Sequence, residues 1–282
     1  MSGITSSFAS ILTPEQVADL VIKPLIADSV AGQVLTAAQT GSHVYRIPIV
    51  TADPSASWTA EGAEITVSDA DIDELAVTPS KLAGLSVISR ELAKDSTPEA
   101  AAVIGDGIVR DLTRKVDQAL FTASTTNGPG GLPGVSGVST VDAGAAFANV
   151  DAFSDAIYTA AGSNGNINAW VTHPDTAKAL SKVKEQTGSN KPLLGADPTM
   201  PGRRQILGVP LLTSPYVSTT DDVVWGISKA FGYMVIREGS EVESDKSVFF
   251  TSDRIAIKAT LRLGFGFPHP PTMVKITTSG TP

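Results

Sequence analysis

Residues 58–96 read WTAEGAEITVSDADIDELAVTPSKLAGLSVISRELAKDS, an acidic, turn-rich span followed by a β-like run. The strand-like stretch HVYRIPIVT (43–51) precedes it, so two extended segments flank an acidic segment of roughly 20 residues. Segments of this length without secondary structure are uncommon in compact domains and are usually functional or disordered. The acidic segment has no cysteine or histidine. We therefore predict a loop whose task is to reach something, not to catalyse a reaction.

Composition places the chain among globular proteins. Of its 282 residues, 42% are hydrophobic and 18% are charged, and the formal net charge is −8. This acidic balance argues against a protein that mainly grips nucleic-acid phosphates. The absence of cysteine excludes disulfides, thiolate zinc sites and cysteine nucleophiles. No apolar run is long enough to span a bilayer, and the N-terminus lacks a signal-peptide pattern, so we expect a protein made in a cytoplasm.

Helical patterns occur at four places. The clearest runs over 96–121, where apolar residues recur at helical spacing and Ser96 with Glu99 forms a capping box. Residues 151–162 and 174–186 also predict helices. A shorter N-terminal helix starts at Thr13 and ends or kinks at Pro24. The stretch AAQTGSH (37–43) is expected to connect it to the next element.

Further strands are predicted over 168–174, within 205–239, over 254–263 and over 273–277. The cluster TTNGPGGLPGVSG (125–137) predicts turns. Helices and strands follow one another in mixed order, without a repeating βαβ unit. The expected fold class is therefore α+β.

A search for catalytic or metal-binding patterns finds nothing convincing. The three histidines, His43, His173 and His269, lack metal-ligand spacing. The run from Asp69 to Asp73 resembles part of a calcium loop, but lacks its glycine and final glutamate, so an acidic loop exposed to solvent is the default. We predict a protein that is not an enzyme and has no cofactor, catalytic residue or metal site.

Taken in order, several motifs resemble those of the major capsid proteins of tailed bacteriophages. Residues 58–96 resemble the extended loop of that family, called the E-loop, and its return strand. The following helix ends in VDQALF and resembles the family's spine helix. The segments NGPGGLPGV, WVTHPDTAKALSKVKEQTGSNKPLL, ILGVPLLTSPYV and DRIAIKATLRLGFGFPHPPTMVKI match later family segments. The similarity runs from about residue 13 to 277.

The resemblance implies the phage major capsid fold, which has an N-terminal arm, an extended E-loop, a peripheral domain with a long spine helix and a β-hairpin, and an axial domain. The expected divisions are the N-terminal arm (1–42), the E-loop and its flanking strands (43–95), the peripheral domain with the spine helix (96–140), the axial domain (141–240) and the closing strands (241–282).

The resemblance also implies a structural function: self-assembly into hexamers and pentamers of an icosahedral shell that encloses double-stranded DNA without sequence-specific binding. The shell would form in the bacterial cytoplasm and become the virion capsid, without a membrane. On this reading the E-loop reaches a neighbouring subunit, although Trp58 packing on its own subunit is the alternative. The expected contact residues are Trp58, Glu61, Glu64, Ile65, Asp69, Asp71 and Asp73.

Two departures from the family lead to further expectations. Some members cross-link an E-loop lysine to an asparagine of a neighbour, but this chain has no lysine between residues 24 and 80, and Asp253 stands where the asparagine aligns best. We therefore expect no cross-link. Some members carry a fused helical scaffold before the arm, whereas this sequence begins near the arm, so we expect a separate scaffolding protein, besides a portal.

Two rival functions remain open at this point. An encapsulin has the same fold and encloses an enzyme in place of a genome. A cytoplasmic hydrolase would use His173 with a serine such as Ser228, although no GxSxG motif places that serine on an elbow.

Overall fold

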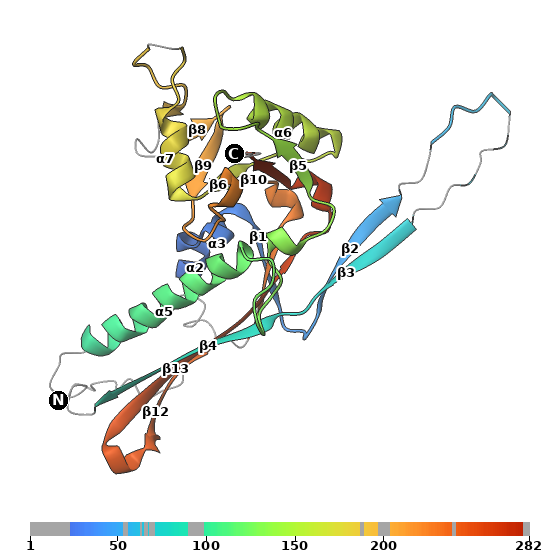
Figure 1. The fold of residues 1–282 in the computed structure, drawn as a ribbon. Coiled ribbons are helices and arrows are strands. Elements are labelled where there is room, and N and C mark those ends of the chain that lie inside the picture. The colour runs from blue at the N-terminus through green and yellow to red at the C-terminus, as the bar shows by residue number, and fades with distance from the viewer. Residues whose placement is uncertain are drawn as a thin grey trace, which may run out of the picture.

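The computed structural model describes residues 23–52, 56–62, 64, 67, 71–89, 99–186, 189–196, 204–238 and 241–278. Its described strands form a seven-stranded sheet, a five-stranded sheet and a two-stranded hairpin. Figure 1 shows the seven-stranded sheet and two helices at the top of the molecule, while a long helix and the long strands of the five-stranded sheet extend to the lower left. The two-stranded hairpin projects to the upper right, away from both.

The seven-stranded sheet forms one end of the molecule. Its strands, in spatial order, are β5 (Ser139–Asp142), β14 (Val274–Thr277), β10 (Val224–Ile227), β6 (Ala169–Thr172), β9 (Val209–Thr213), β8 (Arg204–Ile206) and β7 (Gly195–Ala196). Helix α6 (Asp151–Gly162) packs against β14 and β5, and α7 (Pro174–Lys182) packs against β9. Phe153 of α6 and Trp170 of β6 are fully buried, with their rings edge-to-face at 5.1 Å. This aromatic contact helps to hold α6 on the sheet.

Strand β13 (Arg254–Gly266) organises the five-stranded sheet. It pairs antiparallel with β4 (Ser80–Ser89) along one edge, and with β12 (Glu241–Phe249) and then β11 (Tyr233–Arg237) along the other. Strand β1 (Thr36–Thr40) extends the sheet by pairing in parallel with β11. Because side chains alternate along a strand, one face of β13 carries Ile257, Ala259, Leu261 and Leu263, which are all buried.

Helix α5 (Glu99–Leu120) lies beside β4 and β13 and contributes Leu112, Val116 and Leu120 to the buried interior. Two short helices, α2 (Lys23–Asp28) and α3 (Val30–Val34), pack against α5. The main core cluster therefore joins α2, α3, α5 and both larger sheets.

Asp117 of α5 fixes α3 through its first turn. Its Oδ1 accepts a hydrogen bond from the Ala31 amide at 2.9 Å, and its Oδ2 accepts one from the Val30 amide at 3.2 Å. Ser29 caps the same turn, because its Oγ accepts from the Gly32 amide at 2.9 Å. Burial raises the pKa of the Asp117 carboxyl, while the hydrogen bonds from Ala31 and Val30 act in the opposite direction.

The projecting hairpin consists of β2 (Tyr45–Ala52) and β3 (Asp71–Val77), which pair antiparallel. Its base is anchored to the body by a small cluster of Ile47, Val77 and Val235. The β13 backbone comes close enough for this only because it has glycines here: a Cβ on Gly266 would lie 2.6 Å from Val77 Cγ2. The hairpin is therefore held firmly at its base and leaves the body at a fixed point.

The structure confirms most of the expected elements. The long helix occupies Glu99–Leu120, the second matches 151–162, and the strands at 43–51 and 254–263 appear as β2 and β13. The helix expected over 174–186 ends earlier, at Lys182, because Val183 has an extended backbone. Ser96 and Thr13, the two expected helix caps, lie outside the described residues.

Two expectations are wrong. Residues 37–43 were expected to be a connection, but Thr36–Thr40 form β1. The sequence pattern did not reveal this strand, because its parallel partner β11 lies more than 190 residues away along the chain. The acidic span was expected to be a loop throughout, but Asp71–Val77 form β3 and pair with β2.

The division at residue 42 stays a prediction, although Leu25, Ala31 and Leu35 already belong to the main core. Among the described residues, none of the helices is long and apolar enough to cross a bilayer.

Replacing Asp117 by alanine removes both side-chain acceptors from the start of α3. Because an unsatisfied buried donor costs about 1–3 kcal/mol, we expect Asp117→Ala to lower the free energy of unfolding by about that amount. Asp117→Asn keeps one acceptor oxygen and should lose less. Urea unfolding of the purified chain, followed by circular dichroism, measures the difference. Asp111→Ala, at an exposed position of the same helix, is the control, and equal stability of the two alanine variants would contradict the assignment.

Candidate functional site

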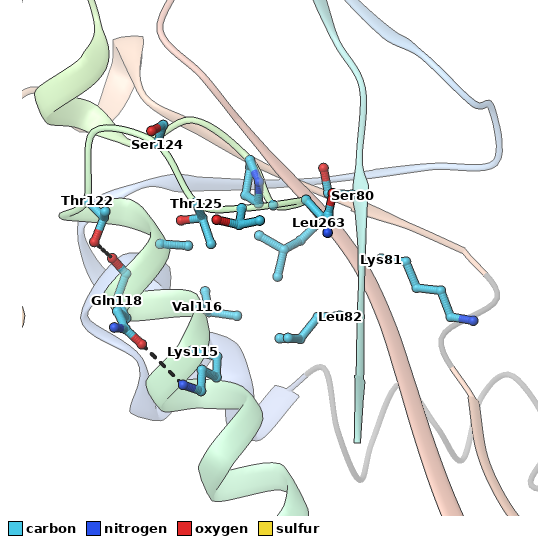
Figure 2. Close-up of a pocket in the computed structure, with 15 residues that line it drawn as sticks. Ser80, Lys81, Leu82, Lys115, Val116, Gln118, Thr122, Ser124, Thr125 and Leu263 are labelled. Atoms are coloured by element: carbon cyan, nitrogen blue, oxygen red, sulfur yellow. Dashed lines mark hydrogen bonds between the residues drawn. The ribbon is translucent and has the colours of Figure 1, made fainter. Parts of the chain in front are cut away.

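The first candidate is a pocket of about 450 Å3 between the end of α5 and the start of β4. Figure 2 shows Leu82, Val116 and Leu263 lining it, while Lys81 points away from it. At its edge, Lys115 Nζ donates to Gln118 Oε1 at 3.4 Å. None of the described residues that line it is a histidine, aspartate or glutamate. The pocket therefore has an apolar floor and no acid–base pair.

A second pocket of about 470 Å3 continues along α5 and β4 and shares Leu82 and Lys115 with the first. Here the helix comes close to the strand, because a Cβ on Gly84 would lie 3.3 Å from Ile108 Cγ2. Together the two pockets form a groove between helix α5 and the edge strand β4, of the kind that incomplete packing of a helix on a sheet leaves.

Two of the three histidines contact backbone groups of the fold, and the third is exposed. His173 is the N-cap of α7, where its Nδ1 accepts from the Asp175 amide at 3.2 Å. His269 Nε2 lies 3.1 Å from the carbonyl oxygen of Ser163, and its ring packs against Phe231 at 5.4 Å. His43 is exposed in the turn before β2.

The pairing of β6 with β10 separates His173 from Ser228. Residue 169 lies opposite residue 227 in this antiparallel pair, so Ser228 follows the end of β10 at which β6 begins, while His173 follows the opposite end of β6. At about 3.3 Å per residue, the offset along the paired strands puts the backbone positions of the two residues about 16 Å apart. This distance excludes a hydrogen bond between them and removes the basis of the hydrolase reading.

The acidic residues do not form a metal site within the described parts of the chain, where no group of three potential ligands occurs. Asp71 and Asp73 are exposed on β3. The Asp73 carboxylate accepts from the neighbouring Glu74 amide at 2.7 Å, and Glu74 forms an ion pair with Arg46 across the hairpin.

We use the name E-loop hairpin for β2, β3 and the residues between them (45–77). Trp58, Glu61 and Glu64 lie between the two strands and are exposed. Ile65 and Asp69 lie outside the described residues. Trp58 keeps its whole side-chain surface exposed to solvent, at 106% of the reference value. It does not pack on the described part of its own subunit, which was the alternative reading.

The sequence analysis missed other exposed apolar residues. Val67 and Ile72 are exposed on the E-loop hairpin, and Leu85 and Val87 are exposed on β4. The signal was present in SKLAGLSVIS (80–89), where Lys81, Ala83, Leu85 and Val87 alternate with the residues that face α5. It was overlooked because an alternating strand is normally read as having its apolar side inward.

A family comparison identifies the chain. The model of the phage capsid family matches residues 9–277. The chain belongs to the phage capsid family. Membership of this family points to a structural protein and not to an enzyme.

One curated relative and two solved structures illustrate the similarity. The capsid polyprotein of Pseudomonas phage PAJU2 is 25% identical over 192 residues, which are 62% of this chain but only 27% of that polyprotein. The capsid of an empty GTA particle has a TM-score of 0.74 at 17% identity and covers 99% of this chain and 94% of its own. The structure from Microbacterium phage Oxtober96 has a TM-score of 0.72 at 14% identity, with 99% and 95% covered. These likenesses establish the phage capsid fold for this chain.

The chain offers no amine on the E-loop hairpin for an isopeptide cross-link, because residues 24–80 contain no lysine. We expect assembled material boiled in SDS to run as a single band near 29.1 kDa. Since the chain has no cysteine, disulfides cannot imitate a cross-link in this assay. A ladder of heavier bands that persists after boiling would contradict the prediction.

Proposed function

We propose that this chain is a major capsid protein, which assembles into hexamers and pentamers of a closed icosahedral shell around double-stranded DNA. Family membership and the phage capsid fold support the proposal. The observation that carries it is the E-loop hairpin, a firmly anchored projection that exposes Trp58, Val67 and Ile72. A monomer gains nothing by exposing these side chains, whereas a neighbouring subunit can bury them.

Trp58 is the proposed anchor of this contact. A buried aromatic side chain removes about 150–250 Å2 from water, which at about 25 cal/mol per Å2 corresponds to about 4–6 kcal/mol before the costs of association. Buried tryptophans are common hot spots of interfaces. Glu61, Glu64, Ile65, Asp69, Asp71 and Asp73 would complete the contact by meeting basic or apolar groups of the neighbour.

The proposed partners are other copies of the chain, a separate scaffolding protein and a portal. DNA is enclosed without sequence-specific contacts, since a chain with a net charge of −8 does not favour tight binding to phosphates. Assembly is proposed to take place in the bacterial cytoplasm, and the final location is the virion capsid.

The alternative is an encapsulin-type compartment, which has the same fold. The two functions differ in what the particle contains. Particles purified from the natural source should contain DNA if the chain is a capsid protein, and a cargo enzyme without DNA if it is an encapsulin. Nuclease-protected nucleic acid, measured after disruption of the particles, decides between them.

The direct test of assembly is light scattering on a sizing column, followed by negative-stain microscopy. Closed particles, or rings of five or six subunits, are the expected result. A homogeneous monomer that never assembles, even with a phage scaffolding protein or a crowding agent, would contradict the proposal.

Removing the anchor should weaken assembly without unfolding the subunit. Trp58 makes no contact that stabilises its own described fold, so we expect Trp58→Ala to keep the thermal unfolding midpoint within about 1 °C while assembly needs at least about tenfold more protein, as for a hot spot. Thr59→Ala, the adjacent exposed position, is the matched control. Assembly by Trp58→Ala at the concentration that suffices for Thr59→Ala would contradict the role of the indole.

A further inference from the structure

Two short connections carry the chain between the two larger sheets. The first connection (228–232) leads from β10 of the seven-stranded sheet to β11 of the five-stranded sheet, and the second (267–273) leads from β13 back to β14. The two connections touch each other, because the rings of Phe231 and His269 lie 5.4 Å apart. A movement of one sheet relative to the other has to bend both connections, so the contacts that hold them decide how rigid the subunit is.

The first connection is hydrogen-bonded to both sheets around Lys229. On the side of the seven-stranded sheet, the Lys229 amide donates to Asn168 Oδ1 at 3.0 Å, and the Asn168 amide donates to the Ile227 carbonyl at 2.9 Å. On the other side, Thr36 of β1 donates its amide to the Gly232 carbonyl and its hydroxyl to the Lys229 carbonyl, both at 2.8 Å. The backbone of this connection is therefore held from two directions.

Helix α3 joins the first connection to α5 through a charged group at each of its ends. The Lys229 ammonium donates to the carbonyl oxygen of Gln33, in the last turn of α3, at 3.1 Å. At the other end, the Asp117 carboxyl of α5 accepts from the amides of Val30 and Ala31. A helix favours negative charge at its start and positive charge at its end. Both groups therefore stabilise α3, and they come from different parts of the subunit.

The packing around α3 leaves it no room to shift. Four apolar side chains of α2, α3 and the residue after α3 are at most 1% exposed, namely Leu25, Ala31, Val34 and Leu35. A Cβ on Gly232 would lie only 2.5 Å from Leu35 Cδ2, so the first connection lies directly against the end of α3. Figure 1 shows α2 and α3 between α5 and the seven-stranded sheet, and the core cluster around them contains side chains of both sheets.

We propose that α3 is a clamp that fixes the seven-stranded sheet relative to α5, with Asp117 holding its first turn and Lys229 holding its last turn. The clamp makes these parts one rigid body, so that the subunit enters a shell with a fixed angle between them. This consequence for the shell rests on the proposed function, whereas the clamp is a property of the single subunit and can be tested without assembly.

Hydrogen exchange of the unassembled subunit tests whether the two ends of α3 depend on each other. Lys229→Met keeps the aliphatic stem and removes the ammonium, and Lys229 is exposed, so the variant should fold. We expect the amides of Val30 and Ala31 to exchange about tenfold faster than in the natural chain, although the ammonium binds at the other end of the helix. Lys229→Arg keeps the charge and should keep the protection. Unchanged protection of these two amides in Lys229→Met would overturn the clamp.

Ser228→Ala is the matched control in the same connection. The Ser228 hydroxyl is buried and has no hydrogen-bond partner among the described residues. Its removal takes no contact from the clamp, so Val30 and Ala31 should keep their protection. Equal acceleration of exchange in Ser228→Ala and Lys229→Met would show that any change in this connection loosens α3, and would overturn the role of the ammonium.

A double-mutant cycle tests the two ends of the clamp together. Asp117→Asn weakens the first turn of α3, and Lys229→Met weakens the last. Because both act on the same short helix, we expect the double variant to raise the ratio of unfolded to folded protein by at least about threefold less than the product of the two single effects. Urea unfolding followed by circular dichroism measures these ratios. Independent effects, which multiply, would contradict the clamp.

The consequence for the shell is measured on assembled particles by negative-stain microscopy. The natural chain, Lys229→Arg and Ser228→Ala should each give a narrow distribution of particle diameters. Lys229→Met, in which the angle is no longer fixed, should give a broader one, and an equally narrow distribution would overturn the consequence for the shell. If the natural chain forms no particles, the proposed function fails, while the exchange and unfolding measurements still decide whether the clamp exists.

Discussion

The antiparallel ladder between β4 and β13 is the constraint on which both ends of the molecule depend. It pairs every residue from Ser80 to Ser89 with a partner in Leu263 to Arg254. A slip by one residue would turn Leu85 and Val87 toward α5 and expose Leu82 and Gly84. Only Thr78 and Pro79 separate β3 from β4, so the same ladder also sets the point at which the E-loop hairpin leaves the body. One register thus sets both the exit point of the E-loop hairpin and the face of β4 that is exposed.

The described residues contain no active-site arrangement, and the proposed function of the chain depends on contacts between its exposed surfaces and neighbouring subunits. The E-loop hairpin exposes apolar groups among carboxylates, and the exposed face of β4 carries apolar groups beside basic residues. Burial of apolar groups by a neighbouring subunit would give an intersubunit contact its strength, and complementary charges would give it direction and register. A contact between two different surfaces needs no second protein to form a ring, which is the property that a shell subunit requires.

Much of the fold could be predicted from the sequence. The helix over Glu99–Leu120 repeats apolar residues at helical spacing, and β13 alternates strongly, so local patterns were sufficient for both. Strand β1 was missed because its partner β11 is distant in the sequence. The acidic part of β3 was missed because aspartate and glutamate are uncommon in strands. Trp58 was correctly placed in the projecting segment, and its exposure removes the alternative that it packs on the described part of its own subunit. The alternation in residues 80–89 places Leu85 and Val87 on one face of β4, but the position of α5 was needed to show that this face is the exposed one.

The central claim is that the chain assembles into a closed shell in which the E-loop hairpin of one subunit is buried against a neighbouring subunit. A cryo-electron microscopy reconstruction of the assembled particle, at a resolution that shows side chains, tests it most directly. The account predicts density for the E-loop hairpin in contact with an adjacent subunit, with the Trp58 indole buried between the two. Density that places this hairpin in solvent or against its own subunit would contradict it.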